Sequence, residues 1–412
     1  MSVSTVKSRR AYVSLGLSAI AVSALALGGV QSSAKPAQIV PPPPISNDLV
    51  LWQQFILAVT PSGVPGKVAY ETFASDQDIY VSNPCAPTKP VPGCNVPAWP
   101  SATSKRAPKS LQRSLLGMAH MRATAALRGA RRGFGVQVIG PAQGCGSPSG
   151  LGGAAAGSGF PKTGCVGEEV RRDRATYDYL VGNGLWSSAG ISQYYATGQP
   201  VTAPWNALEV KADWIPVTTL ATWLGKPASF VTANFYTSSA NVGKGPATAY
   251  AMTSMHISVK TPGFPDWIWA DFENAYTPGR CDLTGCSDSF GATTPTTPAN
   301  AKPWGQYGAC PKSANVTAMM QQANVGAVFA NYCLSGSQST FGTAANPTLL
   351  GSSVVETLNA NVPLAQSSCI SCHAGAAFNA SGPANVGSPI GPNAPAKGYT
   401  AYDFMWGLLF AQ

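Results

Sequence analysis

Charged residues are scarce in this chain of 412 residues, at 10% of the sequence. A typical globular domain has about a quarter. Apolar residues reach 45% and aromatic residues 9%, so the composition excludes a charge-rich disordered chain and predicts a folded protein with a large core. Histidine is scarcer still, with three in the chain, and there is no Gly-x-Ser-x-Gly turn. These absences argue against a Ser-His-Asp hydrolase.

Long hydrophobic runs are absent beyond the N-terminus, which excludes a protein with several membrane spans. At the N-terminus, a basic start over residues 7–10 precedes an apolar stretch over 11–30. Ser32-Ser33-Ala34 then places small residues where a signal peptidase cleaves. We interpret residues 1–34 as a signal peptide for export. The alternative is an uncleaved membrane anchor, because the apolar stretch is about 20 residues long.

Glycine and proline are abundant, at 43 and 35 residues, and indicate a turn-rich structure. The four prolines 41–44 mark residues 35–47 as a stiff Pro-rich spacer. We predict an α+β fold with a central antiparallel β region and several short helices. Residues 48–361 are expected to form the large α+β region, and residues 362–412 a C-terminal segment packed on it.

Hydrophobic periodicity assigns the individual elements. We predict helices over 48–59, 168–183, 314–331 and 400–411. Alternation of apolar and polar residues predicts strands over 208–217, 249–260 and 266–273, and turn signals at Pro262-Gly263 pair the last two. In 249–260 the alternation places His256 on the polar face, which we expect to be exposed.

The chain has ten cysteines, and an exported protein meets an oxidising compartment in which they pair. Setting aside Cys369 and Cys372, eight are left, and eight allow many pairings. Their clustering suggests four local disulfides, which would staple Gly/Pro-rich loops. The expected pairs are Cys85–Cys94, Cys145–Cys165, Cys281–Cys286 and Cys310–Cys333.

The run Cys369-Ile370-Ser371-Cys372-His373 carries the most specific chemical signal. Two cysteines at this spacing can form thioethers to the two vinyl groups of haem, and the adjacent histidine then lies under the iron. The alternative is a redox-active or structural Cys-x-x-Cys that happens to precede a histidine. We predict one covalent haem c, bound by Cys369 and Cys372, with His373 as the proximal ligand. Residues 362–412 are therefore the haem c-binding segment.

The sequence does not determine which group is the sixth ligand of the iron. His256 is the first candidate metal ligand, and His120 is the other histidine. A vacant or water-bound position is also compatible with the motif. Methionine is the further possibility, from Met405, Met252, Met255, Met319 or Met320.

Residues 105–132 contain eight basic residues and no acid. Such charge runs are commonly solvated surface. The functional interpretation is a docking patch for an acidic redox partner protein or for the anionic lipid of a membrane surface. Nucleic acid is excluded as a partner for an exported protein.

Several short segments resemble a family of large bacterial proteins known as "cytochrome c family protein". The resemblance covers most of the chain from about residue 48 and implies cytochrome identity, with Cys369, Cys372 and His373 as the haem residues, but no substrate. The segments are Trp52-Gln53-Gln54-Phe55, Tyr70-Glu71-Thr72-Phe73, residues 174–179, residues 183–185, residues 209–214, His256-Ile257, residues 267–273, the haem motif and Asp403-Phe404-Met405-Trp406.

Two functions fit these observations. The first is an exported electron-transfer cytochrome of the periplasm or cell envelope. The second is a haem-dependent enzyme, peroxidase- or oxygenase-like, with an open distal site. Its distal candidates are His256, Tyr250, Trp267 and Glu273.

Overall fold

The structure is a computed structural model that describes residues 46–86, 92–100, 166–240, 247–282, 284–293, 305, 307–343, 348–356, 367–385 and 398–411. The predicted signal peptide, the basic stretch 105–132, His120 and the expected pair Cys145–Cys165 lie outside these residues. Residues 45–412 form one compact unit. Within the described ranges no helix is long and apolar enough to cross a membrane.

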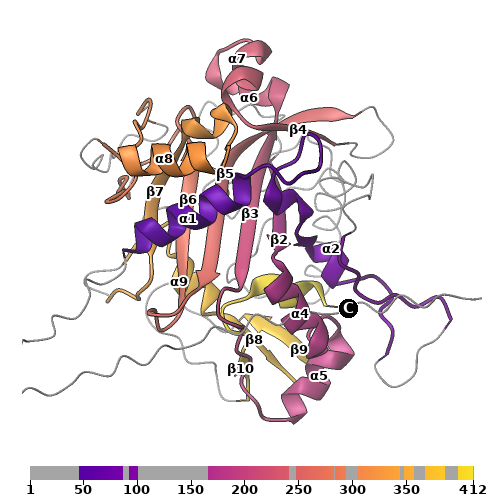
Figure 1. The fold of residues 1–412 in the computed structure, drawn as a ribbon. Helices are drawn as coiled ribbons and strands as arrows, with labels where there is room; N and C mark the ends of the chain where they lie inside the picture. The colour runs from indigo at the N-terminus through magenta and orange to yellow at the C-terminus, as the bar shows by residue number, and fades with distance from the viewer. Residues whose placement is uncertain are drawn as a thin grey trace, which may run out of the picture. The chain divides into compact units, whose positions relative to one another are not determined.

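A central antiparallel sheet organises the unit, with strand order β1-β2-β3-β5-β6-β7 and β4 paired to β5 (Figure 1). A smaller antiparallel sheet has the order β10-β8-β9. The predicted α+β class with a central antiparallel region is therefore confirmed. The strands are β1 (Ala74–Ser75), β2 (Gly167–Arg172), β3 (Leu208–Pro216), β4 (Thr237–Ala240), β5 (Thr248–Lys260), β6 (Trp267–Asn274), β7 (Tyr332–Gln338), β8 (Ala376–Asn379), β9 (Gly382–Asn385) and β10 (Thr400–Ala401).

Short helices surround the sheets. The α-helices are α1 (Asn47–Val59), α2 (Asp76–Ile79), α4 (Arg174–Gly182), α5 (Ser188–Ala196), α6 (Val217–Leu224), α7 (Ala228–Asn234), α8 (Ala314–Gln322) and α9 (Cys369–His373). The 3-10 helices are η1 (Ala69–Thr72), η4 (Ala327–Asn331) and η7 (Trp406–Phe410). The helix predicted over 48–59 and the three predicted strands are confirmed.

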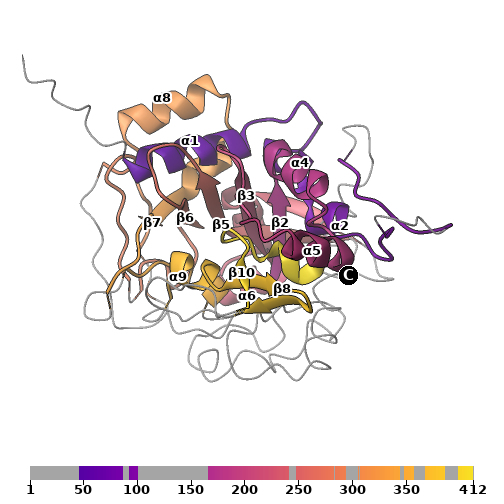
Figure 2. The same cartoon turned by 90° about the horizontal axis from the view of Figure 1, so that it is seen from below.

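One face of the sheet is apolar and packs against α1 and α8. Side chains such as Val210, Ile257 and Phe272 form a core with Trp52 and Phe55 of α1. Figure 2 shows α1 and α8 on this side of the sheet and α9 with the small sheet on the other. The alternation of β3, β5 and β6 therefore separates two layers, and the Cys369–His373 segment lies on the side opposite α1.

Three predicted helices are wrong in part. Residues 167–172 form strand β2, and the helix begins only after Asp173, whose side chain accepts from Thr176 N. The predicted helix 314–331 ends at Gln322 and resumes as the 3-10 helix η4. Residues 400–411 form β10 and η7 instead of one α-helix. In the first case tertiary pairing with β3 overrides a segment of good local helix propensity.

The polar face of β5 is buried, which corrects the expectation that it is exposed. Ser254 is fully buried and the His256 side chain is 13% exposed. The alternation predicted over 249–260 also fails at the start of this strand. The register shifts opposite Asp213 and Trp214, so Tyr250 and Met252 join the apolar core instead of sharing a face with His256.

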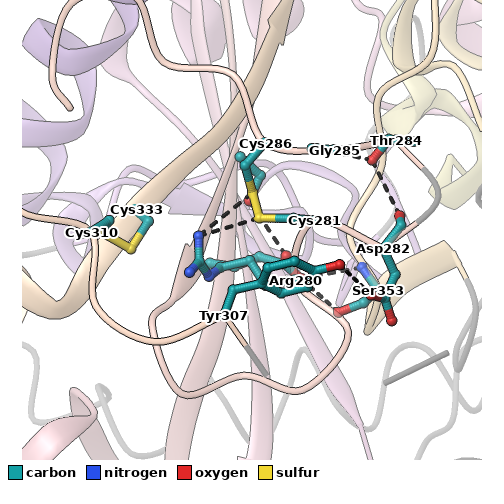
Figure 3. The surroundings of a disulfide bond; sticks show 12 residues. Arg280, Cys281, Asp282, Thr284, Gly285, Cys286, Tyr307, Cys310, Cys333 and Ser353 are labelled. Carbon is teal, nitrogen blue, oxygen red and sulfur yellow. Dashed lines mark hydrogen bonds between the residues drawn. A yellow bond between two sulfur atoms is a disulfide. The ribbon is translucent and has the colours of Figure 1, made fainter. Parts of the chain in front are cut away.

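Three of the four expected disulfides are present: Cys85–Cys94, Cys281–Cys286 and Cys310–Cys333. Figure 3 shows Cys281–Cys286 beside Arg280, whose Nη1 lies 3.5 Å from each sulfur. Disulfides are typical of proteins outside the cytoplasm. The three pairs therefore support the part of the localisation prediction that places the protein outside the cytoplasm.

Candidate haem site

Helix α9 brings the two cysteines and the histidine of the motif onto one side of a single helical turn. Cys369 and Cys372 are three residues apart, and His373 is four from Cys369, which is the spacing of neighbours on a helix surface. Ser368 caps the helix, since its side chain accepts from Ser371 N. The spacing required for haem attachment is therefore set by local helix geometry.

Cys369 and Cys372 are not disulfide-bonded, whereas the other six cysteines of the described ranges all are. Burial raises the pKa of the Cys372 thiol to about 11 and that of Cys369 well above its ordinary value. Both side chains are therefore neutral thiols at pH 7. Two thiols left unpaired in an otherwise disulfide-bonded set are what covalent attachment of a cofactor requires, and both are only partly exposed.

The His373 imidazole is oriented by a backbone carbonyl. Its Nδ1 lies 2.6 Å from Phe404 O. Because a carbonyl only accepts, this contact places the proton on Nδ1 and leaves Nε2 with a lone pair. Burial lowers the pKa of His373 to about 4, so the ring is neutral at pH 7. The ring thus presents a metal-binding nitrogen away from Phe404.

Gln338, at the end of β7, fixes the start of α9. Its Nε2 donates to Ser368 Oγ (3.1 Å) and Thr348 O (2.7 Å). Its Oε1 accepts from Ile370 N (2.8 Å). The side chain is buried, so each of these groups loses its partner without gaining water when Gln338 is removed. Gln338 therefore ties the haem motif to the central sheet.

Replacing Gln338 by Ala is expected to lower the free energy of unfolding by about 2 kcal/mol, because buried polar groups of α9 are left unsatisfied. Chemical denaturation monitored by circular dichroism measures this. The matched control is Gln193→Ala on the exposed surface of α5, which should change stability by less than about 0.5 kcal/mol. Equal stabilities of the two variants would show that Gln338 does not hold α9.

The sheet face opposite α1 forms the floor beneath α9. Lys211, His256 and Asp271 are paired across β3, β5 and β6, so their side chains share this face. Trp269 lies two residues from Asp271 on the same face, and its ring centroid is 5.8 Å from that of His373. The site is therefore built from α9 on one side and a buried polar sheet face on the other.

His256 and Asp271 form a close pair at the centre of this floor. His256 Nε2 lies 3.2 Å from Asp271 Oδ1. Burial lowers the pKa of His256 to about 4 and raises that of Asp271 to about 7. At neutral pH the histidine is therefore a neutral imidazole, the form that binds metals.

The remaining candidates for the sixth ligand and the distal site are divided between the two sides of the sheet. Met405 is buried on the same side as α9, next in sequence to the carbonyl that binds His373 Nδ1. Tyr250, a distal candidate of the enzyme hypothesis, packs on the α1 side of the sheet, whereas Glu273 and Trp267 lie on the α9 side. Four methionines belong to the core on the α1 side: Met252, Met255, Met319 and Met320.

Glu273 extends the polar floor along β6. Its Oε1 accepts from Ser352 Oγ (2.8 Å) and Ser353 Oγ (2.9 Å). Burial, with Asp271 nearby, raises its pKa to about 8. The carboxyl is therefore largely protonated at neutral pH in the folded state.

The Glu273→Gln variant is expected to lose less stability at alkaline pH than the parent. Folding raises the pKa of this carboxyl from 4.5 to about 8, so the folded state binds more protons between these values. In the parent, the free energy of unfolding contributed by Glu273 falls progressively as pH rises from 4.5 and is lost once pH passes about 8, a change on the order of 4 kcal/mol. Denaturation at several pH values from 5 to 9 tests this. Parallel pH profiles for parent and variant would contradict it, and exposed Asp178→Asn is the control.

The residues present fit a haem group at this place. The site supplies the thiols of Cys369 and Cys372, the neutral His373 imidazole with a free Nε2, and the aromatic ring of Trp269 beside it. The indole N–H of Trp269 is buried beside His373 and has no hydrogen-bond partner among the residues described, so a bound acceptor would satisfy it. No cluster of three or more His, Cys, Asp or Glu suited to a separate metal ion is found in the same ranges.

Sequence patterns missed several residues of the site. Trp269 and Asp271 were part of the predicted strand 266–273, and no element was predicted at Gln338; nothing in the pattern placed these three residues under the Cys369–His373 segment. Alternation was the signal that could have placed two of them together, because it puts Trp269 and Asp271 on the face opposite Phe272.

Comparison with known proteins returned no relative: no family model, curated protein or solved structure matches the chain.

Proposed function

We propose that the chain is an exported monohaem c-type cytochrome that transfers electrons. Its haem is attached to Cys369 and Cys372, with His373 as the proximal ligand. The observation that supports this most is the arrangement on α9: two unpaired, partly buried thiols and an imidazole whose Nδ1 is held by Phe404 O. The periplasm or cell envelope is the proposed location, in line with the disulfides and the N-terminal signal.

The residues of the site would act on a bound haem as follows. Each cysteine thiol adds across a vinyl double bond, forming a carbon–sulfur bond and leaving its proton on the vinyl group. Haem supplies an iron that cycles between ferric and ferrous states. Phe404 O holds the Nδ1 proton of His373, which leaves the Nε2 lone pair free and would let it bind the iron. On the side of the sheet, buried residues such as Trp269 and Asp271 would limit the water beside the group, which would lower the cost of reorganisation when one electron moves.

His256 is the proposed sixth ligand. It lies on the floor that faces α9, it is neutral at pH 7, and burial keeps water from competing. Two histidines on one iron favour a low potential and a low-spin state. Both properties suit an electron carrier.

A haem-dependent enzyme is the second candidate, and the His256–Asp271 pair is the observation that favours it. A neutral imidazole 3.2 Å from a buried carboxyl can take up and release a proton beside an open iron position. In that case His256 would not bind the metal.

Optical spectra of the purified protein distinguish the two functions. Low-spin ferric and ferrous spectra that do not change with cyanide or peroxide support the electron carrier. A high-spin ferric spectrum together with peroxide turnover supports the enzyme. Protein that carries no haem, when expressed for export with haem-attachment machinery, would overturn both.

The partner proposed for the electron carrier is an acidic redox protein, because residues 105–132 are strongly basic. Anionic membrane lipid is the alternative for the same charge.

A further inference from the structure

A turn of unusual backbone conformation presents the carbonyl that His373 uses. Asp403 and Phe404 have φ angles of 48° and 65°, both in the left-handed region. Met405 N donates to Tyr402 O (3.1 Å), which closes the four-residue turn around them. Aspartate tolerates this conformation, but it is rare for a bulky residue such as phenylalanine. Such a conformation persists only where surrounding contacts hold it.

Two contacts hold Asp403. Its Oδ2 accepts from Ala203 N at 2.6 Å and from Lys260 Nζ, also at 2.6 Å. The Lys260 and Asp403 side chains are 8% and 11% exposed, so this ion pair is shielded from solvent. Lys260 is the last residue of β5, the strand that carries His256. The turn is therefore fastened to the sheet that forms the floor of the site.

Phe404 is held from its other side as well. Its ring packs edge-on against Trp269, with centroids 5.4 Å apart, and Trp269 also contacts the His373 ring. The carbonyl of Phe404 thus has little freedom to leave His373 Nδ1 while both anchors are in place. Loss of the Asp403 anchor removes the contacts that compensate for the strained backbone.

We propose that Lys260 and Asp403 are positioning residues for the proximal histidine, and that their ion pair sets the reduction potential of the haem iron. The inference rests on the proposed function. A firm bond from Nδ1–H to a carbonyl makes the imidazole a more basic ligand. A more basic ligand stabilises ferric iron and lowers the potential. Releasing the turn weakens this bond and raises the potential.

A matched pair of variants separates positioning from charge. Asp403→Asn and Asp403→Ala remove the same negative charge. Asparagine still adopts the left-handed conformation and keeps an oxygen for the Ala203 N–H, whereas alanine does neither. Charge alone predicts equal potentials for the two variants. Positioning predicts a higher potential for the alanine variant.

The experiment is a redox titration of each purified holoprotein, followed by its optical spectrum. We expect the ratio of ferrous to ferric haem at a fixed solution potential to be about tenfold higher in Asp403→Ala than in Asp403→Asn, which is a shift of about 59 mV for one electron. Equal potentials in the two variants would overturn the inference.

Lys260→Met supplies a second test if the alanine variant does not accumulate. Removing a cation stabilises ferric iron and lowers the potential if charge alone acts. Positioning predicts the opposite sign, since the freed turn raises the potential. A fall in potential in Lys260→Met would therefore overturn the inference. Arg174→Met removes a cation from an exposed ion pair and serves as the control.

The two proposals fail in different ways. Haem-free parent protein would refute the proposed function before any titration. Parent and variants that all carry haem, with potentials that follow charge alone, would refute only the positioning role of Lys260 and Asp403.

Discussion

The Cys369→Ala/Cys372→Ala variant is expected to lose covalent haem completely. Both thiols are partly buried, neutral and unpaired on α9, and no other described cysteine is free. Without them, none of the described residues offers a free thiol beside His373. The measurement is a haem stain on a denaturing gel after expression for export with haem-attachment machinery. Parent protein should stain and the double variant should not.

A second cysteine pair provides the control for this experiment. Cys85→Ala/Cys94→Ala also removes two cysteines, but these form a disulfide in a loop far along the sequence from α9. This control should retain the haem stain at the level of the parent. Staining of the Cys369→Ala/Cys372→Ala variant would show that the assignment of the attachment site is wrong.

The His256→Ala variant is expected to convert the iron from low spin to high spin. His256 lies on the floor facing α9, and burial keeps it neutral and able to bind metal. Loss of the ligand opens the sixth position to a weaker ligand such as water. The ferric optical spectrum measures the change, which should involve essentially all of the protein.

Two further variants sharpen the His256 test. His256→Met should stay low-spin with a raised potential, because methionine is also a strong ligand but favours ferrous iron. Met405→Leu should leave the spectrum of the parent unchanged, since Met405 lies beside the carbonyl that binds Nδ1. A low-spin spectrum that survives in His256→Ala would remove His256 as the ligand.

The strands that form the core of the fold could be predicted because their patterns are strong. Residues 208–216 and 267–274 place apolar side chains at alternate positions, and the apolar set packs under α1. The strand at 167–172 could not, because Glu168, Arg171 and their neighbours read as the first turn of a helix. Pairing with β3 and the cap at Asp173 decided its structure, and neither is visible in a local pattern.

Burial of the polar face of the sheet could not be predicted from the sequence. Alternation correctly placed His256 opposite the apolar core, but polar residues on a strand usually face water. Here α9, the small sheet and their neighbours cover that face, so Asp271 and Glu273 are buried. Which chain segment covers a face depends on contacts between residues more than 100 positions apart, such as Trp269 with His373.

The Cys-x-x-Cys-His pattern is visible in the sequence, whereas the residues that hold α9 and His373 in place are not. Gln338 and Phe404 O contact α9 from two separate parts of the chain, and Lys260, from a third, binds Asp403 beside Phe404. Every residue has a backbone carbonyl, so the residue type does not show which carbonyl contacts His373. The left-handed turn at Phe404 gives no signal either, because sequence rules expect glycine or asparagine there.

The intact mass of the exported protein tests the central claim most directly. The proposed function predicts a mature chain that carries the mass of one haem, retained under denaturing conditions and located by peptide mapping on Cys369 and Cys372. An unmodified chain, or one in which these two cysteines form a disulfide with each other, would contradict it.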